Sequence, residues 1–103
     1  MEPMIKVYKL GAGWCGPCRM MKPTIKSLME KYNVEGSDVE IIDIDIDADR
    51  ALAEEHGVRS IPTTLFMVND EFALKRGGVL DGGAIEDIIQ QLKTGTHGNN
   101  LQN

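Results

Sequence analysis

The chain has 103 residues, 42% of them hydrophobic and 26% charged, which suits one globular domain with a single hydrophobic core. Its net charge of −5, with 11 scattered Lys and Arg residues, argues against nucleic acid or an anionic membrane as a partner. No segment approaches the ~20 apolar residues of a membrane helix, and the N-terminal stretch MEPMIKVYKL lacks the parts of a signal peptide. We therefore expect a cytoplasmic protein with no nucleic-acid or membrane partner.

The first half of the chain predicts a strand, a kinked helix and a second strand. Residues 4–10 are apolar and β-prone, and Gly11 ends this strand. Apolar residues recur every three or four positions over residues 16–32, which is typical of an amphipathic helix, and Pro23 inside this run should kink it. Residues 39–46 are rich in Ile and predict the second strand. A right-handed crossover makes the two strands parallel.

The second half of the chain predicts four more elements. They are, in order, a short helix over residues 48–55, a strand over residues 63–68, a strand from Phe72 to Lys75 or Arg76, and a helix over residues 82–92. Asp47 or Asp49 can cap the short helix, and Asn69-Asp70 supplies a tight turn that makes the last two strands antiparallel. The sequence thus predicts an α/β domain over residues 1–93, with a central four-stranded mixed sheet and three flanking helices on both of its faces. Residues 94–103 have the composition of a disordered tail.

Both cysteines lie in the segment Trp14-Cys15-Gly16-Pro17-Cys18, where the first strand gives way to the helix. At this junction Cys15 would face the unpaired N–H groups and the positive end of the helix dipole, which favour the thiolate form. Pro17 suits the first turn of a helix, because its missing N–H costs nothing there, and Gly16 keeps the site open. Cys18, one turn further on, is expected to be more buried and close enough to reach Cys15.

Two thiols at this spacing can ligate a metal, form a disulfide or shuttle electrons. A structural zinc site needs four ligands, and the chain adds only His56 and His97, which are not at ligand spacing. The segment from Asp43 to Glu54 nearly matches a calcium loop, but its sixth position is Ala48 instead of glycine and a strand precedes it. We therefore expect no metal, and we favour a redox dithiol.

The segment WCGPC, placed after a strand and before a Pro-kinked helix, resembles the active site of the thioredoxin family. Ile61-Pro62-Thr63, just before the third strand, is similar to the loop of that family whose proline is cis. The resemblance runs from about Ile5 to Leu92. It implies a thioredoxin-like fold and a protein-disulfide reductase with no bound cofactor, in which Cys15 and Cys18 form a redox-active disulfide. Cys15 would attack a substrate disulfide, and Cys18 would resolve the mixed disulfide that results.

The resemblance also implies where substrates bind and which partners the protein has. Pro62 would lie against the cysteine pair, and the Ile61 backbone would pair with the substrate chain like an added strand. The expected substrate-binding residues are Trp14, Gly16, Pro17, Ile61, Pro62 and Gly78. The expected partners are disulfide-containing proteins and a flavoprotein thioredoxin reductase, which recharges the disulfide with electrons from NADPH. We expect the protein to act as a monomer.

The chain departs from the thioredoxin pattern at three places. It begins at the strand before the cysteines, so the strand and helix that come first in a full thioredoxin have no counterpart. Gly11 stands where a tryptophan is usual. The buried aspartate expected beneath the cysteines aligns with Lys9, and the lysine expected opposite it aligns with Asp43. Asp43 would then accept the proton of Cys18, with Lys9 as its charge partner.

Two other functions stay open at this point. The short outline is similar to that of the glutaredoxins, which favours a glutathione-dependent oxidoreductase, although Gly16-Pro17 between the cysteines is not the usual pair of that family. The second alternative is a binding subunit in which redox chemistry is secondary.

Overall fold

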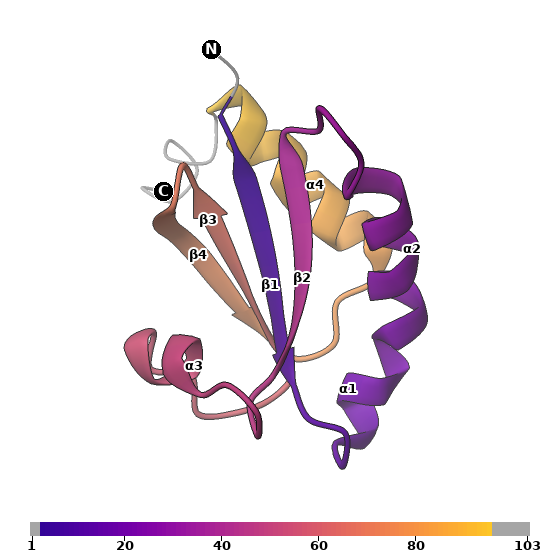
Figure 1. Ribbon diagram of the computed structural model, residues 1–103, viewed down its shortest axis with the longest axis vertical. Helices are drawn as coiled ribbons and strands as arrows, with labels where there is room; N and C mark the ends of the chain where they lie inside the picture. The colour runs from indigo at the N-terminus through magenta and orange to yellow at the C-terminus, as the bar shows by residue number, and fades with distance from the viewer. Residues whose placement is uncertain (1–2, 96–103) are drawn as a thin grey trace.

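Four strands form one mixed sheet, in the order β2-β1-β3-β4, in the computed structural model, which describes residues 3–95 (Figure 1). In chain order the strands are β1 (Ile5–Gly11), β2 (Val39–Asp45), β3 (Thr63–Val68) and β4 (Glu71–Gly77). β2 runs parallel to β1, whereas β3 is antiparallel to both β1 and β4. The mixed sheet expected from the sequence is confirmed, with every strand end within about two residues of its expected place.

The β3–β4 hairpin turns on two residues with left-handed backbones. Asn69 and Asp70 have φ values of 51° and 68°. Two successive residues of this kind form a type I′ turn, whose twist matches that of the strands it joins. The tight turn predicted at this dipeptide is therefore confirmed.

The long helix expected over residues 16–32 is divided into two. α1 (Gly16–Met20) and α2 (Lys22–Tyr32) meet at Met21. Pro23 lies in the first turn of α2, where a missing N–H costs nothing, but without that N–H it cannot continue the hydrogen bonding of α1. The predicted kink is confirmed, and the division raises the number of helices from the expected three to four.

The remaining helices are α3 (Ala51–Glu55) and α4 (Gly82–Thr94). α3 starts three residues later than expected, because a turn comes first in which the N–H groups of Ala48 and Asp49 both donate to the carbonyl of Asp45. Asp49, rather than Asp47, accepts a hydrogen bond from the N–H of Ala51. α4 ends two residues past its expected end, and residues 96–103 of the expected tail lie outside the described residues.

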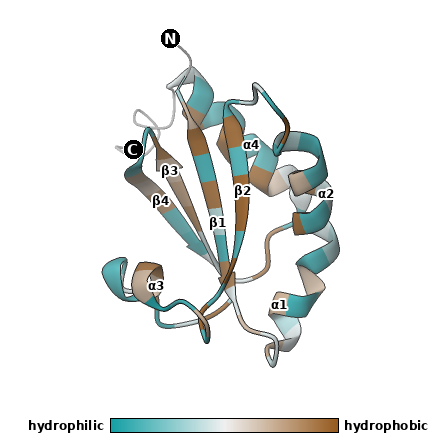
Figure 2. Cartoon of the chain, viewed as in Figure 1, coloured by the Kyte–Doolittle hydropathy of each residue, from teal (hydrophilic) through white to brown (hydrophobic). Residues whose placement is uncertain are grey.

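One apolar core lies between the sheet and the two longer helices, α2 and α4, and we call it the main core. It is made of Ile5, Val7, Met21, Ile25, Leu28, Val39, Ile41, Phe66, Leu74, Ile85, Ile89 and Leu92. Figure 1 shows α4 behind the sheet and α2 beside β2. Figure 2 shows the alternation of apolar and polar residues along β1 and β2 that puts one side of each strand toward these helices. No helix among residues 3–95 is long and apolar enough to cross a membrane.

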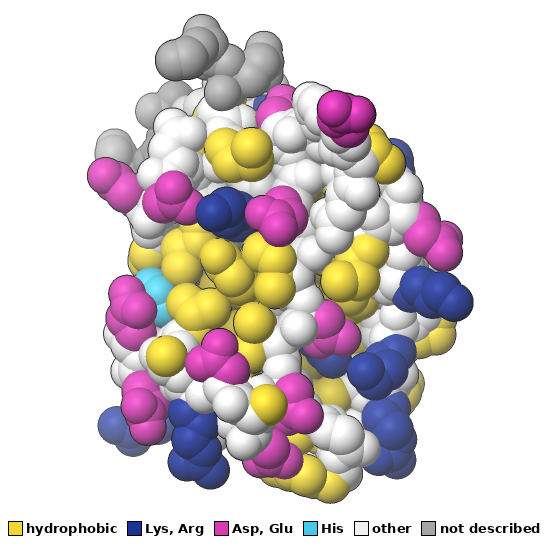
Figure 3. All heavy atoms as spheres, viewed as in Figure 1, with side chains coloured by type: hydrophobic (Ala, Val, Ile, Leu, Met, Phe, Trp, Pro, Cys, Tyr) yellow, Lys and Arg dark blue, Asp and Glu magenta, His cyan; other side chains and the backbone are white. Residues whose placement is uncertain are grey.

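The other face of the sheet is covered less completely. Tyr8 and Ile42 alternate with main-core residues along their strands, so their side chains lie on this face. An irregularity in the β3–β4 register turns Phe72 to the same side, where it is 49% exposed and stacks on the ring of His56. Figure 3 shows an apolar patch on this face. The expectation of helices on both faces therefore holds unevenly. The two longer helices cover one face, and the other has only the short α3, whose following residue His56 stacks on Phe72.

The outer edge of β2 is closed by side chains. The amide of Asn33 donates to the carbonyl of Ile41 and accepts from its N–H, both at 2.8 Å. The hydroxyl of Ser37 makes the same pair of bonds with Val39, at 3.0 and 3.1 Å. An edge strand normally offers such groups to another strand. At these two residues the edge groups are already satisfied.

Candidate redox site

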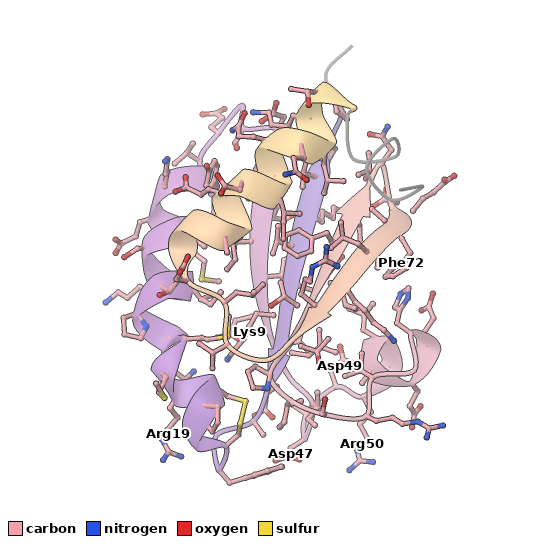
Figure 4. The ribbon with its side chains drawn as sticks, turned by 180° about the vertical axis from the view of Figure 1, so that it is seen from behind. Lys9, Arg19, Asp47, Asp49, Arg50 and Phe72 are labelled. Carbon is pink, nitrogen blue, oxygen red and sulfur yellow. A yellow bond between two sulfur atoms is a disulfide. The ribbon has the colours of Figure 1, made fainter. Side chains whose placement is uncertain are left out.

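Cys15 and Cys18 form a disulfide at the start of α1, with their Cα atoms 5.2 Å apart (Figure 4). Cys15 is the N-cap residue of this helix, and the N–H of Cys18 donates to its Sγ at 3.2 Å. Pro17 lies in the first turn, where no N–H is needed. The strand-to-helix junction expected from the sequence therefore places Cys15 at the start of a helix, where its sulfur accepts one backbone hydrogen bond.

The two sulfur-bearing residues differ in burial. Cys15 is 7% exposed and Cys18 is 1% exposed. Both pack with Ala12, Ile46 and Ile61 in a small apolar group that is separate from the main core, and we call it the site cluster. A reagent or substrate can therefore reach the first cysteine more easily than the second, which is the order of burial that the sequence predicts.

The loop before β3 lies beside the cysteine pair. The Ile61–Pro62 peptide bond is cis, as the resemblance implies. The carbonyl oxygen of Ile61 is 3.9 Å from Cys15 Sγ. Gly78, with a φ of 88°, donates from its N–H to the carbonyl of Pro62 at 2.8 Å. The structure thus brings the carbonyl of Ile61 beside Cys15 and ties Gly78 to Pro62, the residue that follows Ile61.

Two side chains hold the loop between β1 and α1. The indole N–H of Trp14, a residue that is 67% exposed, donates to Asp47 Oδ2 at 2.8 Å. Arg19 Nη1 donates to the carbonyl of Gly13 at 3.0 Å. Figure 4 shows Arg19 and Asp47 at the same end of the molecule as the disulfide. The sequence indicated Asp47 as a helix cap and as part of the near-match to a calcium loop, and no local pattern pointed to its bond with Trp14.

Lys9 and Asp43 lie opposite each other on the paired strands β1 and β2. Lys9 Nζ is 3.4 Å from Asp43 Oδ1, and Lys22 Nζ is 3.7 Å from the other carboxylate oxygen. The Lys9 side chain is 3% exposed, against 28% for Asp43. The predicted ion pair is therefore present, with the lysine inside and the carboxylate between it and solvent. A pocket of about 240 Å³ borders both side chains.

No group of three or more His, Cys, Asp or Glu side chains among residues 3–95 is arranged to hold a metal ion. The acidic segment from Asp43 onward does not form a loop around a cation. Asp45 Oδ1 instead accepts from the N–H of Asp47, and Asp43 pairs with the two lysines. The described residues at the site therefore offer a thiol pair and a nearby ion pair for chemistry.

Comparison with known proteins gives the class to which this fold and site belong. The model of the thioredoxin family matches residues 3–91. A thioredoxin of Porphyra purpurea is 38% identical over 60 residues, which are 58% of this chain and 53% of the relative. A thioredoxin of Borreliella burgdorferi is 34% identical over 79 residues, which are 77% of this chain and 65% of the relative.

A solved structure of a thioredoxin from Halobacterium salinarum has a TM-score of 0.74 and 31% sequence identity, and the match covers 87% of this chain and 75% of that one. The chain therefore belongs to the thioredoxin family. It spans between about half and two thirds of the length of the two curated relatives described above.

Proposed function

We propose that this protein is a thiol–disulfide oxidoreductase that reduces disulfides in other proteins. The observation that carries the proposal is the disulfide between Cys15, at a helix start, and the buried Cys18, with the cis Pro62 loop beside it. The relatives are named thioredoxins, which supports the same activity. The redox groups belong to the chain itself, so the reaction uses no bound cofactor.

The reaction has two exchange steps. In the reduced protein, the Cys15 thiolate attacks a substrate disulfide, and one substrate sulfur leaves as a thiolate that takes a proton from solvent. The other substrate sulfur stays bonded to Cys15 as a mixed disulfide. The Cys18 thiolate then attacks Cys15 Sγ, which forms the intramolecular disulfide and releases the second substrate thiolate. Two electrons thus pass to the substrate, and Asp43 is the proposed acceptor of the Cys18 proton.

The substrate docks around the exposed side of Cys15. Trp14, Gly16 and Pro17 border this sulfur along the chain, and Ile61 borders it from the loop before β3. In our proposal an extended substrate segment pairs with the backbone of Ile61, as in other strand-addition complexes. The bond from Gly78 to Pro62 steadies this loop during docking.

The proposal extends to the partners of the cycle. A flavoprotein thioredoxin reductase would return the disulfide to the dithiol with electrons from NADPH, and the substrates would be disulfide-containing proteins. In this proposal the protein acts in the cytoplasm, where thiols are kept mostly reduced, and it acts as a monomer. One thioredoxin-like domain over residues 1–93 would carry the whole activity.

The test is reduction of insulin disulfides by the full chain, recharged in parallel by dithiothreitol, by thioredoxin reductase with NADPH, and by glutathione with glutathione reductase. We expect reduction with the first two and little with the third. Reduction with glutathione alone would favour the glutaredoxin-like alternative. Failure in all three assays, dithiothreitol included, would contradict the proposed activity, whatever the natural reductase is.

A further inference from the structure

A lysine is buried in the sheet directly under the redox pair. Lys9 is 2% exposed and lies near the end of β1, two residues before Gly11. Its side chain is on the same face of the strand as Val7, toward α1 and α2. A buried ammonium is costly unless anions or polar groups offset its charge. The atoms around Lys9 Nζ therefore indicate what this charge does.

Gly11 shows how close the ammonium comes to Cys18. A Cβ atom built on Gly11 would lie 3.0 Å from Lys9 Nζ and 3.0 Å from Cys18 Sγ. The two atoms are separated by at most twice this distance, about 6 Å, which is the range over which an opposite charge favours ionisation. A side chain at position 11 would press on both atoms. The glycine therefore lets the ammonium and the sulfur approach each other.

The other charged groups around Cys18 are more exposed than Lys9. From β2, Asp43 is shared between Lys9 and Lys22 of α2, and its side chain is 28% exposed. The exposed Asp45 borders the pocket and accepts from the N–H of Asp47, and Arg19 of α1 donates to a backbone carbonyl.

From β3, the neighbour of Lys9 across the strands is Thr64. Its buried Oγ1 has no hydrogen-bond partner in the described structure and carries no charge. Solvent screens the exposed charges more than the buried one. The ammonium of Lys9 is therefore the most deeply buried of these charges near the sulfur of Cys18, and the one that solvent screens least.

We propose that the Lys9 ammonium stabilises the thiolate of Cys18 and so activates it as the resolving nucleophile. This inference rests on the proposed disulfide-reductase function. Cys18 loses its proton to Asp43 or to water in the adjoining pocket, and the negative sulfur is held near the positive charge. It then attacks Cys15 Sγ, the bond between Cys15 and the substrate sulfur breaks, and the substrate leaves as a thiolate.

The proposal gives Lys9 and Asp43 effects of opposite sign on Cys18. Removal of the ammonium should raise the pH at which Cys18 ionises. Removal of the carboxylate takes away a negative charge that opposes the thiolate, so the same pH should fall or stay unchanged. If Asp43 acted alone, as a base, its loss would slow resolution and Lys9 would matter only through it.

The experiment titrates Cys18 by its ultraviolet thiolate absorbance in the full chain carrying Cys15→Ser. We expect Lys9→Met to raise the midpoint by about one pH unit or more, which means about tenfold less thiolate at neutral pH. Lys22→Met is the matched control, because it removes an exposed lysine from the same carboxylate. It should shift the midpoint much less, and Asp43→Asn should not raise it. Equal shifts for Lys9→Met and Lys22→Met, or a rise for Asp43→Asn as large as that for Lys9→Met, would overturn the inference.

A second variant covers the case in which Lys9→Met does not fold. The double variant Lys9→Met/Asp43→Leu removes both charges of the pair, so neither is left without its partner. The midpoint of its Cys18 titration should lie above that of Asp43→Asn by the same amount. The insulin assay on the unaltered chain is a separate readout. If insulin is reduced but Lys9→Met does not shift the titration, only the inference about Lys9 is contradicted. If the titration shifts but insulin is not reduced, only the proposed function is contradicted.

Discussion

The main core and the site cluster lie along the same sheet and differ in what they contain. The main core is apolar throughout and joins all four strands to α2 and α4. The site cluster is small, includes both cysteines, and borders the buried Lys9 across Gly11. The first can supply most of the hydrophobic stabilisation. The site cluster and its neighbour Lys9 keep a charge close to the reactive sulfur atoms, which adds little stability but serves the proposed thiol–disulfide exchange.

Changes in the two regions should therefore affect different properties, stability in one case and reactivity in the other. A change in the main core should lower the free energy of unfolding and leave the chemistry of the folded molecules intact. A change in the site cluster should do the reverse.

The largest effect expected is that of Cys15→Ser on activity. Insulin reduction should fall to the uncatalysed background, because the attacking sulfur is gone, while the urea midpoint stays close to that of the reduced parent protein. Cys18→Ser is the matched variant: it should also stop turnover, but it should accumulate a mixed disulfide with substrate, visible by mass spectrometry. A mixed disulfide in Cys15→Ser instead would reverse the assigned roles. In the reduced parent protein, alkylation should label Cys15 before Cys18.

The next largest effect is on stability, from Phe66→Ala in the main core. This ring is fully buried, so its loss should cost about 3–5 kcal/mol in the free energy of unfolding measured with urea. Phe72→Ala is the control, because that ring is 49% exposed on the other face and should cost clearly less. The preference of an alkylating reagent for Cys15 should stay unchanged in folded Phe66→Ala. Loss of this preference would mean that the two regions are coupled.

A smaller and asymmetric effect is expected where the two regions meet, at Lys9 and Asp43. Asp43→Leu leaves a buried ammonium without its carboxylate and should cost about 3 kcal/mol. Lys9→Met should cost less, because Asp43 is partly exposed and keeps Lys22 as a partner. The double variant should recover much of the loss of Asp43→Leu in urea unfolding. Additive costs in this cycle would show that the pair is not coupled.

The smallest effect concerns Glu86, on α4 and remote from the site. Hydrogen bonds from Lys31 and then Tyr32 hold the pKa of Glu86 below its usual value of 4.5. A lowered folded-state pKa means that the contribution to stability is present above about pH 4.5 and is lost as the pH falls below it. Glu86→Gln should therefore be slightly less stable than the parent at neutral pH, and the difference should shrink in acid. A constant difference from neutral to acid pH, measured by urea unfolding, would argue against this contribution.

The sequence predicted the parts of the molecule that depend on local chemistry. Pro23 locates the break between α1 and α2, because a residue without an N–H cannot continue the hydrogen bonding. Asn69 and Asp70 predict the hairpin turn, because both tolerate a left-handed backbone. The position of Cys15 at a strand-to-helix junction follows from apolar periodicity and the glycines before it. The cis bond at Pro62 followed only from the family resemblance.

Contacts between distant segments were not predictable in the same way. Asp47 looks like a helix cap, since acceptors before a helix usually are, yet it bonds to Trp14, more than thirty residues away. The closeness of Gly11 to both Lys9 Nζ and Cys18 Sγ depends on how β1 and α1 pack together. The ion pair of Lys9 and Asp43 could be predicted because the two residues align with the aspartate and lysine that the family resemblance places on neighbouring parallel strands.

The bonds from Asn33 and Ser37 to β2 also bear on how the protein behaves in concentrated solution. Sheets of different molecules join through bare strand edges, and a strand rich in Val and Ile is a common starting point for fibrils. Here the outward N–H and C=O groups of Val39 and Ile41 already have partners on their own chain. A neighbouring molecule would have to displace two side chains before it could add a strand. The β2 edge should therefore resist strand addition when the protein is crowded, and an extended peptide should find its place beside Ile61 instead of along β2.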